Sequence, residues 1–264
     1  MMDLIKNIFN ILFFASLSIV AVLSYLQARK TLFTPIKTEI FKLQMESFQE
    51  VIEFFNKNND HDFNEVFGFR EIFDLNAANM HRRYIKLFFF KEIEIKDEDI
   101  KRRKAATYGA IYTAEEAGRC LTIIEPGSEL KSTGNKTKKI TEPALMLAEW
   151  NQYSHDGVVF TKRYHDETEK LKKLASSPLL PKELADLMHA FLRINHNNLG
   201  LIGVVVARLS KEMPTLYSTA EDVVRFDSSG MWGSYIEERE NLDNISSQIL
   251  KYINEYLKIN KIMA

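Results

Sequence analysis

The chain has 264 residues and is nearly neutral, with 35 Lys and Arg against 36 Asp and Glu, so no global positive field recruits nucleic acid. Ten glycines and six prolines are too few for a turn-rich β architecture, and a single cysteine, Cys120, excludes an internal disulfide framework. We therefore expect an all-α fold, in a chain long enough to bury a real core.

The segment from Ile8 to Leu26 contains no formal charge and predicts a transmembrane helix. As a helix its nineteen residues span about 28 Å, close to the thickness of the hydrocarbon layer. A buried core helix is the alternative, but core helices of this length usually carry a polar face, and this segment has no charged residue. A cleavable signal peptide needs small residues at alternate positions before the cut, and Leu26 occupies the relevant position.

The flanking charges predict the orientation of this span. Only Lys6 precedes it, whereas Arg29, Lys30, Lys37 and Lys42 follow it. Because positive residues favour the cytoplasmic side, we expect an N-terminus outside, a cytoplasmic body and a single pass through a bacterial inner membrane. The lipid bilayer is then the first expected partner, and the lone cysteine agrees with a reducing compartment.

One face of the span carries polar and small residues, at spacings of three and four. The face consists of Asn7, Asn10, Phe14, Ser18, Ala21 and Tyr25. Such a face suits close packing between transmembrane helices, and an inward-facing ring of Asn10 and Ser18 suits a narrow wet pore. The alternative is that Ser18 bonds its own backbone and the asparagines lie near the headgroups.

Thr34 and Pro35 predict the start of a separate stalk helix that runs to about Asn56, with Thr34 as N-cap. Its apolar arc is too wide for one partner helix to cover, so it joins the domain core or a subunit interface. A second helix is expected from about Phe63 to Ile85. The alternation from Lys91 to Ile95 is interpreted as a frayed helix end.

The remaining elements are also expected to be helical. Asp97 caps a helix that is predicted to continue to Leu121, and Pro143 starts a short one to about Tyr153. The three further helices are expected over about 157–175, 181–213 and 233–262. The second of these contains an apolar run, from Leu199 to Leu209, that is too short to span a membrane.

These elements divide the chain into four parts. Residues 1–30 form the anchor, 31–126 the stalk and first helical lobe, 127–140 a basic loop, and 141–264 the C-terminal helical lobe. The loop has linker composition, KSTGNKTKK over residues 131–139, and is the best candidate for a boundary between lobes.

Candidate ligand-binding residues come from the long helix and from the basic clusters. His189, Arg193 and His196 share one helix face, but their spacing and the lack of a nearby carboxylate do not favour a metal site. Arg102 and Arg103 belong to a cluster over 101–104. Three further basic clusters lie at 81–83, 131–139 and 162–163. Together these clusters could bind lipid headgroups, a nucleotide or an oligonucleotide; the alternative is that they are solvated helix faces.

The sequence contains no catalytic signature, so no catalytic residue and no cofactor is predicted. There is no phosphate-cradling glycine loop, no Gly-x-Ser-x-Gly elbow, no Cys-x-x-Cys and no His-Glu-x-x-His zinc motif. The pair His155 and Asp156 is adjacent in sequence, and adjacent residues on a helix point in different directions, which disfavours an acid–base pair.

The span, the stalk over 34–56 and the absence of enzyme motifs together resemble the architecture of single-span membrane effectors of bacterial anti-phage defence systems. The resemblance implies homo-oligomerisation and a cytosolic body whose ligand sensing gates or disrupts the membrane. It carries over no functional residue.

Three functions are therefore open from the sequence. The first is a non-enzymatic homo-oligomeric effector that permeabilises or signals through the inner membrane. The second is a tethered adaptor that holds a cytosolic protein partner near the bilayer. The third is a tethered hydrolase or nuclease sited around His189, Arg193 and His196.

Overall fold

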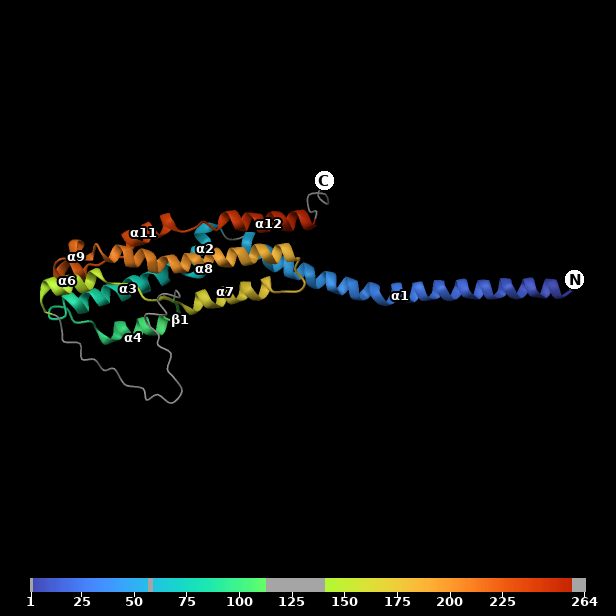
Figure 1. The fold of residues 1–264 in the computed structure, drawn as a ribbon, viewed down its shortest axis with the longest axis horizontal. Helices are drawn as coiled ribbons and strands as arrows, with labels where there is room; N and C mark the ends of the chain where they lie inside the picture. The colour runs from blue at the N-terminus through green and yellow to red at the C-terminus, as the bar shows by residue number, and fades with distance from the viewer. Residues whose placement is uncertain (1, 57–58, 113–140, 258–264) are drawn as a thin grey trace, which may run out of the picture.

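The computed structural model describes residues 2–56, 59–112 and 141–257, and these confirm the all-α expectation except for two short strands (Figure 1). The elements are α1 (Met2–Asn56), α2 (Asp60–Phe67), α3 (Phe69–Phe88), α4 (Asp97–Ala106), β1 (Gly109–Ile111), α6 (Pro143–Asn151), β2 (Val158–Phe160), α7 (Lys162–Ala175), α8 (Lys182–Ser210), α9 (Met213–Leu216), α10 (Ala220–Val224), α11 (Ser229–Glu238) and α12 (Asp243–Leu257). The predicted loop over 127–140 lies outside the described residues.

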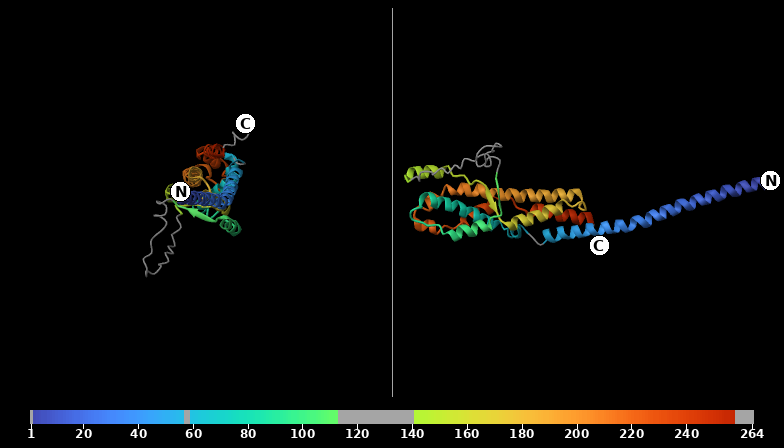
Figure 2. Two further views of the ribbon diagram at one scale, coloured as in Figure 1. Left: turned by 90° about the vertical axis from the view of Figure 1, so that its right-hand side faces the viewer. Right: turned by 90° about the horizontal axis from the view of Figure 1, so that it is seen from below.

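Helix α1 joins the apolar N-terminal segment to the body in one continuous helix of 55 residues. Its stretch Ile11–Arg29 has a mean hydropathy of 2.0 and is long and apolar enough to cross a membrane. This N-terminal part extends clear of the other helices in Figure 1 and in the right view of Figure 2, whereas Phe48, Val51 and Phe55 near its end are fully buried.

The predicted start of a separate stalk helix at Thr34 is wrong, because Pro35 lies inside α1. A proline in a helix removes one backbone hydrogen bond and crowds the preceding turn, but it need not end the helix when long helical segments continue on both sides. The amphipathic stalk is therefore the second half of α1 and not a new element.

Helix α8 is the central spine of the body, as the predicted helix over 181–213 indicated. It packs against α3, α7, α11 and α12. Near its middle Phe191 contacts the rings of Phe55 and Phe63, each with a centroid distance of 5.0 Å. Buried residues before and after the segment 113–140 belong to one hydrophobic core.

The region between α3 and α6 differs from the expectation. Helix α4 ends at Ala106 instead of continuing, and Gly109–Ile111 pairs antiparallel with Val158–Phe160, which was predicted as the start of a helix. A Cβ at Gly109 would approach the Phe160 ring to 2.7 Å, so close cross-strand packing needs glycine there. The alternation from Lys91 to Ile95 is a turn and an extended segment, not a helix end.

The C-terminal helix predicted over 233–262 is two helices, α11 and α12, separated at Arg239–Leu242. In a continuous helix, the backbone N–H and carbonyl of Glu240 would bond to other backbone groups of that helix. Here the side chain of Asn198 on α8 bonds to both instead. Its Nδ2 donates to the Glu240 carbonyl at 2.8 Å, and its Oδ1 accepts from the Glu240 N–H at 3.0 Å. The break is thus stabilised by a tertiary contact that periodicity does not encode.

Candidate ligand-binding site

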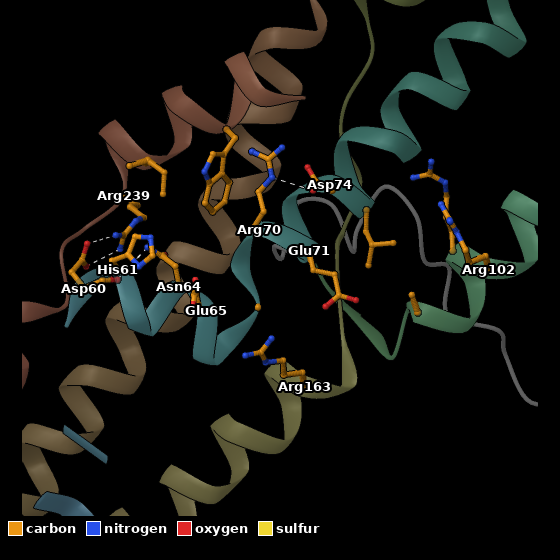
Figure 3. Close-up of a pocket in the computed structure, with 16 residues that line it drawn as sticks. Asp60, His61, Asn64, Glu65, Arg70, Glu71, Asp74, Arg102, Arg163 and Arg239 are labelled. Atoms are coloured by element: carbon orange, nitrogen blue, oxygen red, sulfur yellow. Dashed lines mark hydrogen bonds and ion pairs between the residues drawn. The ribbon is translucent and has the colours of Figure 1, made fainter. Parts of the chain in front are cut away.

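A cavity of about 1080 Å³ opens between α2, α3, α4, α7 and α11 (Figure 3). Five arginines from four different segments line it, and we call it the arginine pocket: Arg70, Arg102, Arg103, Arg163 and Arg239. Two of the predicted basic clusters, at 101–104 and 162–163, thereby meet at one surface although they are far apart in sequence.

The turn at Gly68 shapes one wall of the arginine pocket. Gly68 has a φ of 66°, ends α2 and starts α3 without an intervening loop, and this left-handed conformation favours glycine. A Cβ there would meet Arg163 Cδ at 3.4 Å. The Arg163 Nε donates to the Val66 carbonyl at 3.1 Å, so the same turn orients an arginine of α7.

Three of the arginines are held by carboxylates. The Nη1 of Arg239 donates to Asp60 Oδ1 at 3.0 Å, Arg70 Nε to Asp74 at 3.1 Å, and Arg103 Nε to Asp99 at 2.7 Å. The hydrogen bond from Arg103 is the main cause that holds the pKa of Asp99 below its usual value. These pairs fix the arginines in place.

The other two arginines have more capacity for a ligand. The Arg102 side chain is 80% exposed, and its Nη2 lies 3.4 Å from Asp99 Oδ1, while the other oxygen of this carboxylate accepts from Arg103. Arg163 forms no ion pair among the described residues, and the bond described for its guanidinium is the one from Nε to the Val66 carbonyl. In Figure 3, Arg163 and Arg102 lie on different sides of Glu71.

The arginine pocket also contains acidic and aromatic side chains. Glu65 and Glu71 line it without a carboxylate–cation pair among the described residues, and the Arg70 guanidinium lies 5.3 Å from the centre of the Trp232 ring. Arg239 Nε and Asn64 Oδ1 are buried without a hydrogen-bond partner in the described part of the chain. The pocket thus offers guanidinium groups, most of them fixed in place, to a ligand that carries negative charge.

Nothing in the described part of the chain forms a metal site, since no group of three or more His, Cys, Asp or Glu side chains converges there. The arginine pocket therefore fits ligand binding through charge and hydrogen bonds. It holds no constellation of nucleophile and base that would indicate catalysis among the residues that line it.

The structure places the predicted ligand-binding residues in two groups. Arg102 and Arg103 line the arginine pocket. His189, Arg193 and His196 lie on one exposed face of α8 and do not line it.

The predicted packing face of the span is exposed along α1 where the structure describes it. Phe14 and Tyr25 are 66% and 67% exposed, and Ser18 and Ala21 are exposed as well. Ser18 Oγ donates to its own backbone at the Phe14 carbonyl, at 2.9 Å, in agreement with the alternative for this residue. The side chains of Asn7 and Asn10 lie outside the described residues.

Sequence reasoning missed Asp60, Arg70, Trp232 and Arg239 as site residues. Asp60 lies in a segment that was expected to be a loop, and Arg239 in what was expected to be a continuous helix. Each is a single residue in an unremarkable local pattern, so only the tertiary arrangement of α2, α3 and α11 brings them together.

Comparison of the chain with protein-family models, with curated proteins and with solved structures finds no match.

Proposed function

We propose that this chain is a single-span, non-enzymatic membrane effector that forms homo-oligomers, binds an anionic cytosolic ligand and permeabilises or signals through the inner membrane. The observation that carries this function is the continuity of α1. One helix contains both the apolar stretch Ile11–Arg29 and the core residues Phe48, Val51 and Phe55. A change in the body is therefore transmitted to the span by a rigid element.

The continuity of α1 also supports retention of the span. A signal-peptide cut near residue 28 would divide a helix between two of its turns and leave the exposed apolar segment of the stalk as a new terminus. The charge asymmetry, with Arg29 and Lys30 directly after the span, supports an outside N-terminus and a cytoplasmic body.

Self-association is supported by a stripe that runs from the span into the stalk. Phe14, Tyr25 and Ile36 are eleven residues apart, which is about three helical turns, so they lie on nearly the same face. Ile40 and Leu43 continue this stripe, and all five side chains are exposed, between 42% and 67%. A second copy of α1 would cover this apolar surface, which a single copy leaves exposed.

The arginine pocket has a physical route to α1. Asp60, at the pocket, accepts from Arg239 and from the Leu242 N–H at 2.9 Å, and its own N–H donates to Asp243 at 2.6 Å. These bonds hold the start of α12, which packs on α1, with Tyr256 5.3 Å from Phe48 between ring centres. An anion that competes with Asp60 for Arg239 would loosen this connection.

Two measurements test this function. The mass of the detergent-solubilised chain should exceed that of a monomer, whereas a simple tether would be monomeric. Ion leakage from cells that overexpress the chain should fall in Asn10→Leu with Ser18→Leu, because both changes remove polar groups from the proposed packing face.

Ser16→Leu is the matched control for the leakage assay. Ser16 also bonds its own backbone, at the Leu12 carbonyl at 2.9 Å, but lies on the opposite side of α1. Equal leakage in all variants, or none in the wild-type chain, would count against a pore. Full function after exchange of residues 1–30 for an unrelated span would favour the adaptor instead.

A further inference from the structure

A second cavity, of about 310 Å³, lies between α3 and the segment that leads into β2, apart from the arginine pocket. Arg82, Arg83 and Lys86 of α3 line one side of it. The other side is the turn before β2, where Gly157 has a φ of 79°. We call this cavity the α3 cavity.

The α3 cavity has an excess of positive charge. Among the described residues that line it, the only carboxylate is Asp156, which accepts from Ser154 Oγ at 2.7 Å and lies 3.9 Å from Arg83. Lys86 forms no ion pair among the described residues. The three cations Arg82, Arg83 and Lys86 and the carboxylate of Asp156 together give the described lining a formal charge of +2.

Arg82 is the least compensated of these cations. Its Nη2 is buried and has no hydrogen-bond partner in the described part of the chain. The carboxylate that acts on it, Asp99, is already bonded to Arg103 at 2.7 Å. Burial, and after it the positive charge of Arg103, lowers the pKa of Arg82. An unpaired guanidinium nitrogen out of water is costly, and an anion that binds the part of the Arg82 side chain that lines the cavity offsets this cost.

The two polar rings that line the cavity, His155 and Tyr153, are bonded to each other and to Asn76 beside it. Asn76 Nδ2 donates to two carbonyls, those of Ile72 and Val159, so its Oδ1 is the acceptor for the His155 Nε2–H at 2.9 Å. His155 Nδ1 then accepts from the Tyr153 hydroxyl at 2.8 Å. With both nitrogens bonded, His155 is not a base poised for catalysis.

The aromatic ring that lines the cavity is also occupied. Tyr153 stacks on Trp150 with a centroid distance of 4.7 Å, and the Arg83 guanidinium lies over the ring at 5.7 Å. No ring face is therefore left for a nucleobase. The cavity suits a compact charged group and not a stacked base.

From this arrangement we propose that Arg82, Arg83 and Lys86 form a binding site for the phosphate group of a small soluble phosphomonoester. A phosphomonoester carries a charge of about −1.5 to −2 at neutral pH, which matches the excess charge of the cavity. Guanidinium groups bind phosphate oxygens through paired hydrogen bonds.

The position of the α3 cavity favours a soluble ligand over a lipid of the surrounding membrane. The C-terminal half of α3 and α6 lie at the end of the body opposite to the apolar part of α1 (Figures 1 and 2). If α1 crosses the bilayer, the headgroups of that bilayer lie at the other end of the molecule.

The test uses the full chain in nonionic detergent, reductive methylation of lysines and peptide mass spectrometry, with inorganic phosphate and then ribose 5-phosphate as probes. We expect phosphate to slow the methylation of Lys86 about threefold or more relative to chloride at equal ionic strength, because a phosphate-bound ammonium is less available to the reagent. Lys211, an exposed lysine elsewhere, should react at an unchanged rate.

Arg82→Gln should abolish the protection of Lys86. If this variant does not fold, Arg83→Gln, at a more exposed position, replaces it and should weaken the protection. Arg225→Gln, at an exposed arginine elsewhere, should keep it. Unchanged Lys86 reactivity in phosphate, protection by phosphatidylglycerol vesicles but not by phosphate, or loss of protection in Arg163→Gln of the arginine pocket would each overturn the assignment.

Discussion

At the scale of single residues, the Asn76 side chain on α3 connects two segments that are distant from it in sequence, β2 and the turn before it. It is fully buried on α3, and its amide bonds both the N–H and the carbonyl of Val159 as well as His155. One side chain thus holds β2 and the turn before it against α3, beside the α3 cavity.

Replacement of Asn76 by Leu should lower the free energy of unfolding by about 2 to 4 kcal/mol, because it leaves buried donors and acceptors of Val159 and His155 unpaired. Urea unfolding of the detergent-solubilised chain measures this loss. Asn197→Leu, on the exposed face of α8, is the control and should change stability little. A small effect of Asn76→Leu would mean that water replaces the amide.

His81 should make stability depend on pH. Its Nε2 bonds the Val223 carbonyl at 2.9 Å, and its ring stacks on Phe226 at 4.3 Å. Burial, opposed by the bond to Val223 and assisted by the charge of Arg103, lowers its pKa below 6.5. The unfolded chain then binds the proton more readily, so His81 destabilises the fold as the pH falls below 6.5.

The variant His81→Gln, which keeps a donor for the Val223 carbonyl, should therefore lose less stability than wild type between pH 7 and about pH 5.5. Urea unfolding at both pH values measures the difference. A wild-type loss that equals that of His81→Gln would show that other groups cause the acid sensitivity.

At the scale of elements, the continuity of α1 through Pro35 has a direct measurement. Spin labels at Ala28 and Glu46, with Cys120 replaced by Ser, lie eighteen residues apart and should show a narrow distance near 27 Å in a continuous helix. Dilution with unlabelled chain removes distances between copies.

Labels at Asp186 and Val204 are the matched control for this distance. Both are exposed, both lie inside α8, and they have the same separation of eighteen residues. If the label distance across Pro35 is clearly shorter than that of the control, or its distribution is much broader, α1 is interrupted at Pro35. The stalk would then be a separate helix, as the sequence predicted.

At the scale of the whole molecule, the pair of Asp60 and Arg239 connects the arginine pocket to α12 and thereby to α1. The Arg239 side chain is only 4% exposed. Asp60→Ala should lower the free energy of unfolding by about 3 to 5 kcal/mol, because it leaves a buried guanidinium unpaired. Hydrogen exchange should rise in α12 and in residues 48–56 of α1.

Asp74→Ala is the control for this connection. It removes the partner of Arg70, but that pair is 41% and 45% exposed, so the expected loss is below about 1 kcal/mol. Equal exchange in α12 for both variants would show that the pocket and α1 are not connected through Asp60.

The sequence by itself determined the apolar span, the helical class and the spine α8, because charge content and periodicity are local properties that packing does not reverse. A dense run of cations in the sequence also pointed to Arg102 and Arg103, which line the arginine pocket; their binding of a ligand stays a prediction. The tertiary structure alone decided the end of α4 at Ala106 and the break at Arg239, since each depends on a partner that is distant in sequence. Both cavities are of this second kind, because the angles between helices, and not the order of residues, determine which side chains meet.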